Sequence, residues 1–176
     1  MALLRMQSRE FEEWLAEFQQ LRLPLWSEFP DLELYMDQVI SEINQWLNPL
    51  LDVKITKTMI NSYVKMAIIE RPDKKRYRRD HLAELIVVSI MKLVFPLEVI
   101  KQGISQALAN EVASRAYDQF VALFNTEIAN INAQLTVNEF NLKEEPLHIV
   151  QKVAVKSVIY KLIGTKLVTL EDSDSI

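Results

Sequence analysis

The stretch ITKTMINSYVKMAIIERPDKKRYRRD, residues 55–80, joins a short amphipathic helix pattern to a basic turn. One stripe of the predicted helix is apolar and consists of Ile60, Tyr63, Val64 and Ala67. Thr56 stands where an N-cap residue is favoured, so we expect the helix to run from there to about Ala67. Pro72 then breaks the chain inside a polar stretch, which predicts a turn flanked at most by short extended pieces.

The opposite face of this helix carries the side chains that a major-groove helix uses, namely Lys57, Thr58, Asn61 and Lys65. The run that follows it contains Lys74, Lys75, Arg76, Tyr77, Arg78 and Arg79. A basic loop beside such a helix supplies phosphate contacts in the manner of a wing. The predicted DNA-binding residues are these ten side chains together with Thr56, at the helix end that faces the DNA backbone.

Charge is concentrated in the same stretch. Residues 54–80 contain nine basic and three acidic side chains, a net charge of +6, within a chain of 176 residues whose net charge is −4. Residues 1–53 carry three basic and ten acidic side chains, and residues 81–176 carry eight and eleven. One basic block in an acidic protein favours a local contact with a polyanion, and a solvated charged loop is the alternative.

Composition excludes several classes of site. The chain has no cysteine, so disulfides, thiolate metal sites and thiol nucleophiles are excluded, and two glycines are too few for phosphate-cradling loops. The most apolar run, Leu85–Met91, is far shorter than the roughly 20 residues that a bilayer requires. We find no secretory signal in the sequence and expect a soluble cytoplasmic protein with no membrane contact.

Helical periodicity dominates the N-terminal part. An amphipathic helix is predicted after Ser8, with Phe11, Trp14, Leu15 and Phe18 on its apolar side. A connector bounded by Pro24 and Pro30 follows it. The next predicted helix starts after Asp31 and ends near Pro49, with inward positions at Tyr35, Val39, Ile43, Trp46 and Leu47.

The remaining helices are also predicted from apolar spacing. A buried helix from Leu82 ends before Pro96, and a short helix covers residues 97–104. Apolar residues then recur at helical spacing from Ser105 to Leu135, which predicts one rod of about 45 Å at 1.5 Å per residue. A last helix is expected from Pro146 to about Ile163, with Gly164 as its C-cap and a disordered tail at 171–176.

Residues 55–101 resemble the winged helix-turn-helix of MerR-type transcriptional regulators. The resemblance is carried by Tyr63, the Ala67-Ile68-Ile69 exit, Pro72, Arg76-Tyr77, Asp80-His81-Leu82 and Phe95-Pro96-Leu97-Glu98-Val99-Ile100. Asn61 stands where those proteins commonly have arginine, and Ala67 stands where they have a helix-ending glycine. The resemblance implies double-stranded DNA as partner, with no metal-sensing role, since the C-terminal part holds no cysteine ligand.

Over most of its length the chain is also similar to an uncharacterised bacterial family, domain of unknown function 1836. The similar stretches are Leu34-Tyr35-Met36-Asp37-Gln38-Val39 and Met59-Ile60-Asn61-x-Tyr63-Val64-Lys65. This resemblance implies no activity.

The predicted architecture is all-α, with a winged helix-turn-helix core at residues 31–104. Residues 1–30 would form an N-terminal helix and connector, residues 105–170 a region for dimerisation or sensing, and 171–176 the tail. A homodimer through the C-terminal helices would place two recognition helices on a pseudo-palindromic site.

Two other functions remain open from the sequence. A helical adaptor would use residues 54–80 only as a solvated turn, with Tyr63 and Tyr77 as core or rim aromatics. His81 and Glu84 lie one helical turn apart, a spacing that can ligate a metal, although an exposed histidine in a capping turn explains His81 more simply. We expect no enzyme activity, no cofactor and no metal.

Overall fold

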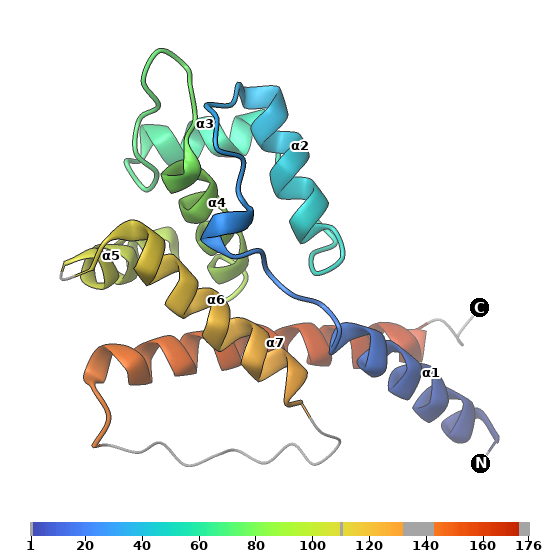
Figure 1. The fold of residues 1–176 in the computed structure, drawn as a ribbon. Coiled ribbons are helices and arrows are strands. Elements are labelled where there is room, and N and C mark those ends of the chain that lie inside the picture. The colour runs from blue at the N-terminus through green and yellow to red at the C-terminus, as the bar shows by residue number, and fades with distance from the viewer. Residues whose placement is uncertain (1, 110, 132–142, 173–176) are drawn as a thin grey trace. The chain divides into compact units, whose positions relative to one another are not determined.

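The computed structural model describes residues 2–109, 111–131 and 143–172 (Figure 1). Its helices are α1 (Ala2–Phe18), α2 (Met36–Leu47), α3 (Lys57–Lys65), α4 (Arg79–Met91), α5 (Leu97–Leu108), α6 (Ala113–Ala129) and α7 (Pro146–Asp172), with a 3-10 turn at Trp26–Glu28. Extended pairing within the described residues is limited to two isolated bridges, Leu34 with Tyr77 and Asp73 with Arg76. The all-α class predicted from the sequence is therefore confirmed.

The chain divides into two compact units. Unit 1 consists of Met1–Arg22 and Phe124–Ile176, and unit 2 consists of Leu23–Leu123. Helix α6 contributes its first part to unit 2 and its last part to unit 1. The four-part domain division expected from the sequence stays a prediction.

Helix α4 forms the centre of unit 2. It packs against α2 and α5, and α2 also packs against α3. Its apolar residues surround the helix axis, so α4 is buried on nearly all sides, as the sequence predicts. The buried side chains of α4 include Leu82, Leu85, Ile86, Val88 and Ile90.

The connector before α2 is held onto α6 within unit 2. The hydroxyl of Tyr117 donates a hydrogen bond to the carbonyl of Pro24 (2.9 Å), and the backbone N–H of Trp26 donates to the Asp118 carboxylate (2.8 Å). The Trp26 and Tyr117 rings also contact each other, with centroids 6.3 Å apart. These contacts fix a segment that leads directly to the start of α2.

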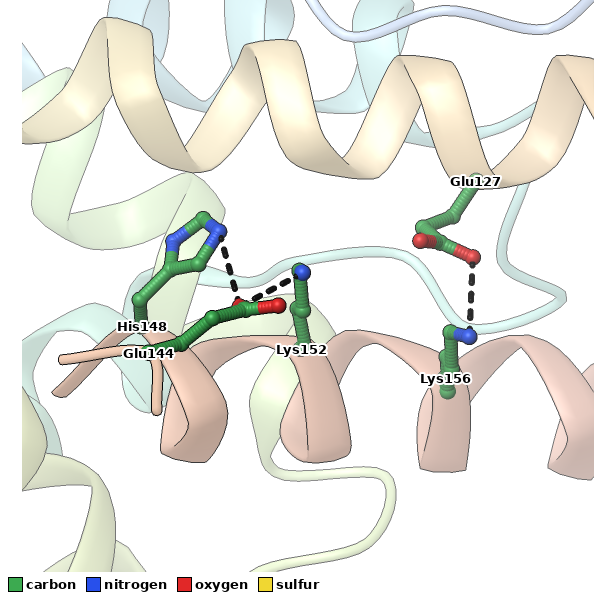
Figure 2. A network of polar contacts seen from close by, with 5 residues as sticks. All are labelled: Glu127, Glu144, His148, Lys152 and Lys156. Carbon is green, nitrogen blue, oxygen red and sulfur yellow. Dashed lines mark hydrogen bonds and ion pairs between the residues drawn. The ribbon is translucent and has the colours of Figure 1, made fainter. Parts of the chain in front are cut away.

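Unit 1 brings α1 and α7 together. Its buried side chains come from three helices and are Phe18, Phe124, Ile128, Val155, Val158, Ile159 and Ile163. Two lysines of α7 form ion pairs, as Figure 2 shows: Lys156 contacts Glu127 of α6 (3.6 Å), and Lys152 contacts Glu144 (2.7 Å). The Lys152 ammonium lowers the pKa of the Glu144 carboxyl below its ordinary value.

Several helix boundaries differ from the sequence prediction, and the short helix expected at residues 97–104 continues to Leu108. The expected rod from Ser105 to Leu135 is wrong, because α5 ends at Leu108 and α6 begins at Ala113. Apolar spacing continues in phase across this break, so periodicity alone does not show it. Leu135 lies outside the described residues.

Helix α7 passes through Gly164 instead of ending there and continues to Asp172. Glycine inside a helix costs only about 1 kcal/mol, and Gly164 has no positive φ of the kind a helix-ending glycine adopts. Helix α1 also begins at Ala2, ahead of the predicted start after Ser8. Residues 173–176 of the predicted tail lie outside the described part of the chain.

Among the residues that the structure describes, none of the helices combines the length and apolarity needed to cross a membrane.

Candidate nucleic-acid interface

Helix α3 has the amphipathic arrangement that its sequence predicts, but it ends at Lys65, and Ala67, which was expected on the apolar stripe, is exposed. The Thr56 hydroxyl accepts a hydrogen bond from the backbone N–H of Met59 (3.3 Å), which confirms Thr56 as the N-cap. Ile60 and Tyr63 are buried on the inner face. The four predicted contact residues Lys57, Thr58, Asn61 and Lys65 are all exposed. Their polar groups are therefore available to a ligand in solution.

Tyr63 anchors α3 from within. Its ring is buried, and its hydroxyl accepts a hydrogen bond from the ammonium of Lys92, which follows α4 (2.8 Å). The same ammonium lies 5.6 Å from the ring centroid. Tyr63 therefore fixes the inner face of α3 and leaves the outer face to the polar residues.

The end of α3 is closed by a Schellman motif. The N–H of Ile68 donates to the carbonyl of Tyr63 (2.9 Å), and the N–H of Ala67 donates to the carbonyl of Val64 (3.1 Å). Ala67 has φ 52°, the left-handed conformation that usually requires glycine. The alanine at this position thus performs the backbone role of a helix-ending glycine.

Two lysines form the tip of a tight hairpin turn. The N–H of Arg76 donates to the carbonyl of Asp73 (2.7 Å), which leaves Lys74 and Lys75 as the central residues. Both have positive φ, 44° and 63°, as the central residues of a type I′ turn do. Such turns strongly favour Asn-Gly, and a left-handed non-glycine residue costs about 1–2 kcal/mol. Both lysine side chains are exposed.

The second arm of this hairpin is fixed to the chain before α2. Leu34 and Tyr77 exchange two backbone hydrogen bonds of 2.8 and 2.9 Å, and Figure 1 shows the two segments side by side. The Tyr77 ring is 3% exposed and lies edge-on to His81, with centroids 5.3 Å apart. Its prediction as a DNA-binding residue is therefore corrected: Tyr77 is a core residue at the base of the hairpin.

Arg76 lies against the aromatic ring of Tyr35, whose predicted inward position is wrong. Its guanidinium is 4.4 Å from the centroid of the Tyr35 ring, a cation–π geometry. Tyr35 was expected to face inward on a helix, but it precedes α2 in extended conformation and is 53% exposed. Because the Tyr35 ring is accessible and lies beside a cation, we add Tyr35 to the candidate interface. The contact with Arg76 follows from the bridge between Leu34 and Tyr77, which local sequence patterns do not show.

The last two arginines of the basic run have different environments. Arg78 is exposed. Arg79 is half-buried, and its guanidinium donates to the carbonyls of Phe29 (3.0 Å) and Pro30 (3.3 Å) and lies 3.4 Å from the Asp31 carboxylate. We therefore treat Arg79 as a residue that holds the connector to α4, and not as a phosphate contact.

Two polar side chains of α4, the half-buried Glu84 and the buried His81, accept hydrogen bonds from the backbone on either side of the hairpin. The Glu84 carboxylate accepts a hydrogen bond from the N–H of Glu70 (3.0 Å), and burial raises the pKa of Glu84 to about 7. The His81 Nδ1 accepts from the N–H of Arg78 (2.9 Å), and burial lowers the pKa of His81 below its ordinary value.

His81 is 1% exposed, so the expectation of an exposed histidine is wrong, although it does stand in the capping turn. Its Nε2 has no hydrogen-bond partner in the described structure. Within the same residues no group of three potential ligands could hold a metal ion.

The comparisons with known proteins bear on unit 2. The family described as "Domain of unknown function (DUF1836)" matches residues 24–120, which is almost the whole of unit 2 and more than half of the chain. The chain matches no curated protein and no solved structure. The matched region contains the connector, α3 and the hairpin. The chain therefore belongs to the DUF1836 family.

Proposed function

We propose that the chain is a sequence-specific DNA-binding regulator of the MerR-like winged helix-turn-helix type. In this proposal α3 is the recognition helix and the hairpin that follows it is the wing. The exposed face of α3 offers an amide, a hydroxyl and two ammonium groups, which suit base edges and phosphates. The hairpin adds Arg71, Lys74, Lys75 and Arg78 as exposed cations.

One observation carries the proposal more than any other: lysine occupies both positive-φ positions of the hairpin tip. A turn with a purely structural role would favour asparagine and glycine there, because these residues adopt the conformation at little cost. Two lysines add strain and bring two exposed positive charges close together. Strain of this kind is characteristic of functional sites, and here the function that two lysines serve best is contact with a polyanion.

Double-stranded DNA is the polyanion that the arrangement favours. A short helix with an exposed asparagine can enter the major groove, while the adjacent hairpin lies along the phosphates. In a homodimer the two α3 helices would contact half-sites about 34 Å apart. With about six phosphates neutralised, log K should fall with log salt at a slope near −5.

The test uses random-sequence duplex DNA, full-length protein and a salt series. The variant Lys74→Asn combined with Lys75→Gly installs the favoured type I′ turn sequence and removes two charges. We expect binding to persist but weaken, with a slope shallower by about 2 for each bound subunit. Thermal melting should show that the variant is at least as stable as the wild type, so that misfolding does not explain the loss.

A charge-matched control removes two lysines elsewhere, Lys101→Asn with Lys166→Asn, and should leave the slope unchanged. Absence of salt-dependent binding by the wild-type protein would overturn the DNA proposal in favour of a protein-interaction domain. Equal slopes for wild type and the hairpin variant would remove the hairpin from the interface.

A further inference from the structure

Helix α7 has two apolar faces. One face is buried in the core of unit 1 through Val155, Val158, Ile159 and Ile163. The other face leaves large apolar side chains exposed, and these are Val150 (55%), Val153 (38%), Tyr160 (40%), Leu167 (41%) and Val168 (60%). Single exposed apolar residues are ordinary, but a continuous row of them marks an interaction surface.

The exposed row has the spacing of a helix–helix interface. Positions 150, 153, 157, 160, 164 and 167 alternate steps of three and four, as the a and d positions of a heptad repeat do. We call these six residues the α7 stripe. It spans about 25 Å at 1.5 Å per residue, and it contains no charged side chain. Its two small residues are Ser157 and Gly164.

We propose that the α7 stripe packs against the same stripe of a second copy of this chain, antiparallel about a two-fold axis. Antiparallel helices place a positions opposite d positions, and a two-fold axis makes the contacts reciprocal. With the axis near residues 158–159, the facing pairs are Val150 with Leu167, Val153 with Gly164, and Ser157 with Tyr160. The bulky Tyr160 thus meets a small Ser157, and Gly164 leaves room for Val153.

The size pattern favours a second copy over an unrelated helix. Two of the three facing pairs set a larger side chain against a small one, Tyr160 against Ser157 and Val153 against Gly164, and the outer pair, Val150 with Leu167, is apolar on both sides. The stripe is thus complementary to its own reverse, as a two-fold interface requires. Open space at Gly164, where an added Cβ would meet nothing within 4 Å, leaves room for the facing side chain.

Charge at the edge of the stripe is compatible with the same arrangement. Lys161 borders one edge of the stripe and Lys156 borders the other, both near the proposed axis, so the two copies of each side chain would approach each other. Lys161 is exposed, and Lys156 is the half-buried one of the two. Figure 2 shows the Lys156 ammonium paired with the Glu127 carboxylate of the same subunit, at 3.6 Å. This ion pair offsets the repulsion that the two copies of Lys156 would otherwise produce.

The interface is independent of the DNA proposal, because its test involves no nucleic acid. Sedimentation equilibrium of the full chain at 1–100 µM should give twice the chain mass of 20.5 kDa. Tyr160→Glu places a charge in the centre of the stripe and should weaken the dimer at least 100-fold. Thr165→Glu, at an exposed position of α7 outside the stripe, should leave the dimer intact. A monomeric wild type, or a Tyr160→Glu variant that remains dimeric, would overturn the proposal.

Disulfide cross-linking between subunits tests whether the two α7 helices are antiparallel, and its expected result is the formation of a bond. The chain has no cysteine, so introduced thiols have no competitors. Under mild oxidation, a mixture of Val153→Cys and Gly164→Cys chains should form the 153–164 disulfide between subunits. Each variant alone should cross-link far less. Efficient cross-linking of each variant with itself would show a parallel pair and contradict the antiparallel arrangement.

Discussion

Backbone strain at the residue scale is concentrated between α3 and α4. Within the described residues, positive φ occurs at Ala67, Lys74 and Lys75. The alanine brings no polar group to its position, so its strain serves only to close α3. Lys74 and Lys75 each place a positive charge at a strained position, and both positions lie in an exposed turn. The left-handed conformation therefore closes a helix at Ala67, whereas at Lys74 and Lys75 it presents charged side chains to the proposed ligand.

Replacing Ala67 with glycine should stabilise the protein. The left-handed conformation costs alanine about 1–2 kcal/mol, and the greater freedom of glycine in the unfolded chain removes part of that gain. We expect the free energy of unfolding of unit 2 to rise by about 0.5–1 kcal/mol, measured by urea titration. Ala107→Gly within α5 is the matched control and should lower it by about 1 kcal/mol. A loss of stability in both variants would show that Ala67 is not strained.

Glu84 should make stability depend on pH in a defined direction. Burial raises its pKa from the ordinary value of 4.5 in the unfolded chain to about 7 in the fold, so the folded state binds the proton more tightly between these values. The stability it confers is present below pH 4.5 and is lost as pH rises toward 7.

Glu84→Gln removes the ionisation and preserves an oxygen that can accept from the Glu70 N–H. At pH 8 the variant should be more stable than the wild type by about 1–2 kcal/mol, and near pH 5 the difference should largely vanish. Denaturant titrations at both pH values test this. Burial lowers the pKa of His81, so this residue reduces the free energy of unfolding as pH falls below about 6.5. The reduction is the same in the wild type and in Glu84→Gln, so it does not alter the difference between them.

At the scale of elements, the sequence predicts the individual helices better than their connections. Thr56, Pro49 and Pro96 mark helix ends by known local chemistry, and Pro72 marks the turn between α3 and α4; the structure agrees at all four. The break between Leu108 and Ala113 contains neither proline nor glycine and was missed. The hairpin tip could not be predicted as type I′, because lysine carries no turn signal. Burial of Tyr77 depends on Leu34, 43 residues away, which local patterns do not show.

Helix α3 and the hairpin should make different contributions to DNA binding. Asn61 is exposed on the recognition face and suits adenine edges, whereas Lys75 at the hairpin tip suits phosphates. Asn61→Ala should relax sequence preference by about 1–3 kcal/mol at one position and leave binding to random DNA nearly unchanged. Lys75→Ala should weaken all sequences about equally. Selection from a randomised duplex pool followed by affinity measurements separates the two effects, and equal effects would contradict this division.

At the scale of the whole molecule, the two proposals fall on different parts of the chain, and the family match covers only one of these parts. The matched residues 24–120 cover unit 2, which carries α3 and the hairpin. Unit 1 lies entirely outside the match and carries the α7 stripe. We infer that unit 2 holds the DNA contact and unit 1 the self-association, so each property should be removable without the other.

The salt dependence of DNA binding should report both properties at once. A dimer presents two basic surfaces, so it neutralises about twice as many phosphates as a monomer, and its slope of log K against log salt should be near −5. Tyr160→Glu, with α3 and the hairpin unchanged, should bind random-sequence DNA with a slope near −2.5, while Thr165→Glu keeps the wild-type slope. Fluorescence anisotropy with a 30-base-pair duplex between 50 and 300 mM salt measures all three. If the Tyr160→Glu variant is monomeric and yet retains the full slope, one subunit makes all the phosphate contacts, and the two-fold arrangement on DNA is wrong even though the α7 interface is right.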